Sequence, residues 1–159
     1  MVRDMLLAAL ALTAPADSEV RLDELLTFAD PARCVPGKAF GTIIDQLRVF
    51  RSADLAPFHL NVPEQYQAAF PGGLIKEGNG AGRVKILQPV NGIWHGVGVL
   101  SIGLEWAPDA EEPDLSLFFA APPPVVLEIL SSQGLIGPSG VARVEPKQGG
   151  TLMTCQRDD

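Results

Sequence analysis

The stretch that decides the fold is Ile93-Trp94-His95-Gly96-Val97-Gly98-Val99-Leu100-Ser101-Ile102-Gly103-Leu104-Glu105-Trp106. Every second residue is apolar over most of it, and a period of two is typical of a strand with one buried face. The first apolar face consists of Ile93, His95, Val97 and Val99. The pattern then changes phase and continues with Leu100, Ile102, Leu104 and Trp106. One extra residue swaps the two faces of a strand, so we predict a bulge or bend at Val99-Leu100.

The segments on either side of this strand predict an antiparallel sheet. Upstream, Arg83 to Pro89 has strand character, and Asn91-Gly92 is a strong signal for a two-residue turn into the next strand. Downstream, Leu115 to Ala120 predicts another strand, and Val141–Glu145 with Thr151–Gln156 predicts a closing hairpin. Consecutive strands joined by short turns pair antiparallel.

Helical periodicity appears in three places. Glu19 to Ala29 predicts a short amphipathic helix, and Lys38 to Phe50 predicts a second helix with apolar residues three and four apart. The three prolines 122–124 introduce a helix over Val125 to Gln133 that ends at Gly134. We therefore predict an α+β fold: N-terminal helices followed by a mainly antiparallel sheet that comprises a meander, one helix and a C-terminal hairpin.

The start of the chain fits two interpretations. Residues 5–12 form an unbroken apolar run, and Ala14-Pro15-Ala16 supplies small residues at the positions that a signal peptidase reads. Residues 1–16 are therefore predicted to be a secretory signal peptide, with residues 17–159 as one α+β domain. The alternative is an N-terminal helix of a cytoplasmic protein. The run is too short for a transmembrane helix, which needs about 20 apolar residues.

Composition excludes two classes of partner. The chain has 159 residues, a net charge of −7 and a sequence pI of about 4.7. Its basic residues are scattered, and only Arg83 and Lys85 lie close together. Nucleic acids and anionic membranes both require clustered positive charge, so neither is expected as a partner. The oligomeric state is not determined by these features.

Two cysteines, Cys34 and Cys155, allow a single intramolecular bridge. If the chain is exported to the periplasm or secreted, oxidising conditions favour a disulfide between them. If the chain stays in the cytoplasm, both are expected to be small buried thiols.

Candidate ligand contacts lie around the tryptophans. Trp94 and His95 stand beside two glycines in the predicted strand, and glycines in a strand often mark the close approach of a ligand or another backbone. Trp106 ends the same strand. We take Trp94, His95 and Trp106 as candidate ligand-binding residues. The alternative for the first two is a core aromatic and a hydrogen-bonded histidine.

Motifs for catalysis, metals and cofactors are missing from the sequence. The glycine run 78–82 lacks the lysine and the following helix of a phosphate loop, so a hairpin loop is predicted there. The acidic segment 105–114 lacks calcium-loop spacing and is predicted to be a solvated loop. His59 and His95 have no metal-ligand spacing, and Gly137-Pro138-Ser139-Gly140 is no nucleophile elbow. No metal site and no cofactor are predicted.

These observations lead to three hypotheses of function. The first is an exported, non-enzymatic domain that binds a protein or a small apolar ligand through its sheet face or the loops around Trp94 and Trp106. The second is a small hydrolase-like enzyme that uses His95 with Glu105, Asp109 or His59. The third is a cytoplasmic structural or assembly subunit.

Overall fold

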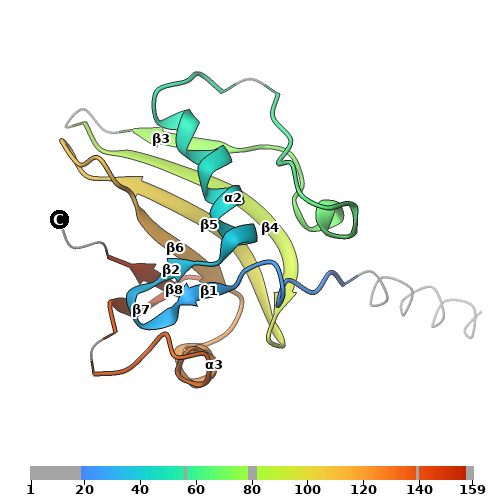
Figure 1. Cartoon of the computed structure of the whole chain (residues 1–159), viewed down its shortest axis with the longest axis vertical. Coiled ribbons are helices and arrows are strands. Elements are labelled where there is room, and N and C mark those ends of the chain that lie inside the picture. Colours follow the sequence, from blue (N-terminus) through green and yellow to red (C-terminus); the bar gives the residue numbers. More distant parts are fainter. Residues whose placement is uncertain (1–18, 56, 79–81, 139, 157–159) are drawn as a thin grey trace, which may run out of the picture.

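The computed structural model of the chain describes residues 19–55, 57–78, 82–138 and 140–156 (Figure 1). The predicted signal peptide, residues 1–16, lies outside these ranges. The main sheet has six strands in the order β3-β4-β5-β6-β8-β7, and every neighbouring pair is antiparallel. The strands are β3 (Ile75–Gly78), β4 (Val84–Trp94), β5 (Val97–Trp106), β6 (Asp114–Phe119), β7 (Ala142–Lys147) and β8 (Gly150–Cys155). The predicted α+β class with an antiparallel sheet is confirmed.

Two α-helices accompany the sheet in the described part of the chain. Helix α2 (Lys38–Arg48) continues into a 3-10 turn, η3 (Val49–Arg51), and lies across the sheet in Figure 1. Its buried face consists of Phe40, Ile43, Ile44 and Leu47, which matches the predicted spacing. Helix α3 (Pro123–Ser132) packs beside β7 and β8. It is followed by Gly134, whose positive φ of 78° suits glycine, as predicted. None of the described helices is both long and apolar enough to cross a membrane.

The predicted helix over Glu19 to Ala29 is wrong. This segment consists of turns that lead into β1 (Phe28–Asp30), which pairs with β2 (Val35–Pro36) in a small second sheet. Leu22 donates its backbone N–H to the carbonyl of Ile93, and Ile93 donates to the carbonyl of Val20. These bonds to β4 occupy backbone groups that a helix would use internally. Leu22, Leu25 and Leu26 are still buried, but from a docked turn.

The predicted turn at Asn91-Gly92 is also wrong. Strand β4 runs through both residues, and the reversal occurs at His95-Gly96, between the paired residues Trp94 and Val97. His95 and Gly96 have φ angles of 47° and 84°, as a tight hairpin turn with two left-handed residues requires. Asn91 instead lies at a shift of the β4–β5 register. His95 is therefore a turn residue and not a strand residue.

The predicted irregularity at Leu100 is confirmed. In the pairing of β5 with β6, Val99 faces Phe119 and Ser101 faces Phe118, so Leu100 is the extra residue. Val97 and Val99 are buried before it, and Ile102, Leu104 and Trp106 are buried after it. Leu100 itself is exposed.

The remaining connections agree with the sequence. Glycine-rich residues 79–81 lie outside the described ranges, and the residues Gly78 and Val84 on either side of them are paired. Strand β3 itself had not been predicted. The acidic segment after Trp106 joins β5 to β6. The C-terminal hairpin forms from β7 and β8, with Lys147 paired to Gly150.

A candidate ligand cleft at the disulfide

One row of paired residues crosses the sheet at the end that carries the candidate site. Leu104 on β5 faces Leu115 on β6, and Leu115 faces Cys155 on β8. Residues directly opposite each other in antiparallel strands project to the same face. These three side chains therefore form an apolar floor that is almost fully buried, with exposed fractions of 1%, 6% and 3%.

Helix α2 forms one wall above this floor. Ile44 and Arg48 are one helical turn apart and so lie on the same side of the helix. Ile44 is buried, whereas the Arg48 side chain is 33% exposed. The helix thus offers an apolar group deep in the site and a guanidinium nearer its mouth.

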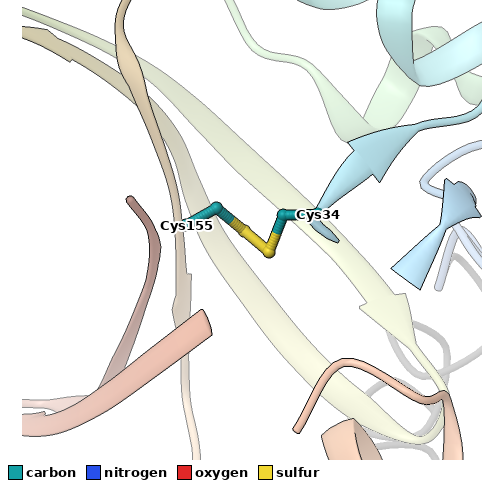
Figure 2. Close-up of a disulfide and its surroundings, with 2 residues drawn as sticks. All are labelled: Cys34 and Cys155. Atoms are coloured by element: carbon teal, nitrogen blue, oxygen red, sulfur yellow. A yellow bond between two sulfur atoms is a disulfide. The ribbon is translucent and has the colours of Figure 1, made fainter. Parts of the chain in front are cut away.

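The disulfide Cys34–Cys155 also lines this site (Figure 2). It joins residues 121 apart in sequence across a Cα–Cα distance of 5.9 Å. Cys34 follows the 3-10 helix η2 (Pro31–Arg33), and its backbone N–H bonds to the carbonyl of Pro31. A second link lies nearby, since the N–H of Val141 donates to the carbonyl of Ala32 at 3.2 Å. The N-terminal segment is therefore held to the C-terminal hairpin at two points.

These groups line a cleft of about 700 Å³. Apolar side chains and polar groups contribute to its lining in similar measure. Its lining residues are Arg33, Cys34, Val35, Pro36, Ile44, Arg48, Leu104, Pro113, Leu115, Val141, Cys155 and Gln156. Two arginines are among these described lining residues, and no aspartate or glutamate is.

Arg48 is held in place by Glu112. The two terminal nitrogens of the guanidinium donate to the two carboxylate oxygens at 2.7 and 2.9 Å, which is a bidentate pair. This hydrogen bonding raises the pKa of Arg48 above its ordinary value, although partial burial opposes the shift. A group whose pKa is raised by folding stabilises the fold at every pH below its ordinary pKa. This stabilisation is lost only when the pH rises through the raised pKa. Arg48 is therefore charged throughout the physiological pH range.

Arg33 is held much more loosely. Its Nε atom lies 3.8 Å from a carboxylate oxygen of Asp30, and the arginine side chain is 81% exposed. A pair of this length between exposed side chains contributes little to stability. The Arg33 guanidinium can therefore change its contacts at low cost.

The structure places Trp94 and Trp106 in the core. Their exposed fractions are 1% and 2%. The indole N–H of Trp94 donates to the carbonyl of Leu26 at 2.9 Å, and its ring packs against Phe119. The guanidinium of Arg51 lies over the Trp106 ring, 5.4 Å from its centroid. Neither tryptophan lines the cleft at the disulfide.

His95 lies beside Trp94 at a smaller hollow of about 200 Å³, which Asp23 and Gln133 also line. Asp23 accepts a 2.6 Å hydrogen bond from the backbone N–H of His95. This hydrogen bond holds the hairpin turn through its backbone, and not through the imidazole. Asp23 was not anticipated from the sequence, because it lies 72 residues before His95.

The residues suggested for hydrolase chemistry are not brought together. His95 precedes β5, and Glu105 lies near the other end of this strand, about 26 Å from its first residue, Val97, at roughly 3.3 Å per residue. Asp109 lies farther along, in the loop after β5, and Glu105 pairs with Arg83. His59 is exposed beside Gly72, in the irregular segment before β3.

The cleft itself was missed by sequence reasoning, apart from the two cysteines. Its lining comes from six separate parts of the chain, and no local motif marks the arginines. The residues of the described ranges contain no group of three or more side chains that could hold a metal ion.

Comparison of the chain with protein-family models, curated proteins and solved structures finds no match.

Proposed function

We propose that this chain is an extracytoplasmic, non-enzymatic domain that binds a small molecule in the cleft at the Cys34–Cys155 disulfide. The observation that carries the proposal is the cleft itself, with an apolar floor and two arginines on its walls. Pockets for small ligands commonly have volumes of about 300–1,000 Å³ and combine apolar walls with a few polar groups. A volume of about 700 Å³ falls within this range.

Two observations support an extracytoplasmic location in this proposal. The disulfide is of the kind that persists in oxidising compartments. The sequence also begins with an apolar run followed by Ala14-Pro15-Ala16, as in a secretory signal peptide. Export would give the cleft its stable disulfide.

The cleft replaces the tryptophan loops as the place of binding in this proposal. Burial leaves the rings of Trp94 and Trp106 little surface to offer a ligand. The groups that line the cleft, by contrast, include the half-exposed Val35 and the two arginines.

A steric block tests the proposal. Val35 lines the cleft on β2 and is 44% exposed, so Val35→Trp fills the mouth with little cost to the core. Val49→Trp is the matched control, because Val49 is 59% exposed and does not line the cleft. The measurement is fluorescence titration of the oxidised protein with two environment-sensitive probes, anilinonaphthalene sulfonate and its neutral parent phenylnaphthylamine.

We expect saturable one-to-one binding of at least one probe. Val35→Trp should weaken it by about tenfold or more, which corresponds to about 1.4 kcal/mol, while Val49→Trp leaves it unchanged. If neither probe binds saturably, or if both variants bind like the parent protein, the proposal is overturned. Thermal melts of both variants establish that they are folded.

A further inference from the structure

We infer that the ligand of this cleft is an amphipathic anion, whose acidic group is bound by Arg48 and Arg33 and whose apolar body contacts the exposed apolar side chains of the lining. The inference rests on the proposed function, since it assigns a chemical class to the same cleft. It includes fatty and aromatic carboxylates or sulfonates, which share one anionic head and an apolar body.

The cleft is lined by positive side chains although the chain as a whole is negative. The whole chain carries a net charge of −7, so most of its surface repels anions. The described residues that line the cleft nevertheless include two arginines and no acidic residue. Even with Glu112 paired to Arg48, the positive charge of Arg33 is balanced only by a distant contact to Asp30.

Arg48 is prepared for such a ligand by its geometry. A guanidinium has five N–H donors in a rigid plane, and Glu112 occupies one on each terminal nitrogen. The Nε edge of the same plane therefore remains available to a second anion. Because Glu112 already fixes the guanidinium, binding requires little further loss of side-chain entropy. We therefore place the anionic head at the Nε edge.

Arg33 supplies the adaptable second contact. Its side chain is 81% exposed and its Asp30 contact is 3.8 Å long, so it can turn toward a bound head group without breaking a strong pair. Both arginines line the same cleft, which lets one head group attract both.

The rest of the lining requires an apolar body on the ligand. Ile44, Leu104 and Leu115 line the cleft but are already buried, whereas Val35, Pro36 and Val141 keep exposed or partly exposed apolar surface. Covering Val35, Pro36 and Val141 with an aliphatic or aromatic body gains from the hydrophobic effect, whereas covering them with a hydrated, fully polar ligand does not. A small inorganic anion would leave this surface uncovered.

The two probes test the inference directly, because they have the same aromatic body and differ by the sulfonate. We expect anilinonaphthalene sulfonate to bind at least tenfold more tightly than phenylnaphthylamine. Added sodium chloride should weaken binding of the sulfonate and leave the neutral probe unaffected. Arg33→Gln should weaken sulfonate binding by roughly threefold, and Arg48→Lys by roughly tenfold, because lysine keeps the charge but not the planar donor edge.

Arg143→Gln is the control for net charge. Arg143 is exposed on the edge strand β7 and does not line the cleft, so its loss changes the chain's charge as much as Arg33→Gln does. We expect it to leave sulfonate binding unchanged. If Arg143→Gln and Arg33→Gln weaken binding equally, the attraction is a general surface effect and the inference is overturned.

The outcomes also separate this inference from the proposed function. Equal binding of both probes, or preference for the neutral one, overturns the anionic ligand while the cleft remains a binding site. Absence of binding by both probes overturns the proposed function itself.

Discussion

The indole N–H of Trp94 donates a hydrogen bond of 2.9 Å to the backbone carbonyl of Leu26, which lies 68 residues earlier in the chain. This bond ties the end of β4 to the N-terminal turns. It is buried, and a carbonyl that loses its donor in such a place costs about 1–3 kcal/mol. Trp94 is therefore a structural residue that fastens two distant segments.

Trp94→Phe should lower the free energy of unfolding by about 1–2 kcal/mol more than Trp106→Phe does. Both substitutions remove a similar volume from a buried side chain. Among the described contacts, however, only the indole N–H of Trp94 donates to a backbone carbonyl. Urea unfolding of both variants measures the difference. Equal losses would show that the hydrogen bond adds nothing to the packing of the ring.

His95→Asn should leave both stability and probe binding close to those of the parent protein. Asparagine adopts the positive φ of this turn and keeps the backbone N–H that bonds to Asp23. His95→Val should cost about 1–2 kcal/mol, because a branched side chain is strained at this φ. A large loss of binding in a stable His95→Asn protein would instead assign the imidazole a functional role.

Gly92→Ala and Gly41→Ala should have opposite effects on stability. A methyl group at Gly92 would lie 2.6 Å from Leu22 Cδ1 and 3.1 Å from the carbonyl oxygen of Val20, so the docked N-terminal turn must shift, at a cost of about 1–3 kcal/mol. At Gly41, inside α2, nothing lies within 4 Å, and alanine should stabilise the helix by about 0.5–1 kcal/mol. Thermal and urea unfolding give both values. A neutral Gly92→Ala would mean that the turn is not packed tightly on β4.

Replacing both Cys34 and Cys155 by alanine should lower the free energy of unfolding by about 5 kcal/mol. The bridge closes a loop of 121 residues, and the chain-entropy model assigns a loop of this length roughly that value. The denaturant slope should also rise, because the unlinked denatured chain exposes more surface. A loss below about 1 kcal/mol would contradict the entropic account for this domain.

Short-range patterns in the sequence predicted those elements whose partners are close in the chain. The spacing of Phe40, Ile43, Ile44 and Leu47 predicted α2, and the phase change at Leu100 predicted the irregularity in β5. Gly134 correctly marked the end of the helix before the last hairpin. In each case the apolar pattern and the local backbone chemistry agree with the burial found in the structure.

Long-range contacts explain the errors. Leu22, Leu25 and Leu26 have helical spacing, but bonds between this segment and Ile93 replace the internal bonds of a short helix, whose first turn is costly to form. Gly92 is small because Leu22 and Val20 approach it closely, and not because the chain turns there. Of the cleft, only its cysteines were foreseen. Arg33 and Arg48 reach one cleft through the docking of α2 and β2 on the sheet, which no local pattern records.

The distance in sequence between Cys34 and Cys155 has a consequence for biosynthesis. At roughly 5–20 residues per second, a ribosome needs about 6–24 s to reach the second cysteine after making the first. Cys155 ends β8, so all six strands of the sheet have been synthesised before the two thiols can meet. The bridge therefore forms only after every strand of the sheet has been synthesised. Before Cys155 has been synthesised, Cys34 is the only cysteine of the nascent chain. An oxidant that acts at that stage can couple Cys34 only to another molecule. This domain therefore requires oxidation to follow the synthesis of β8.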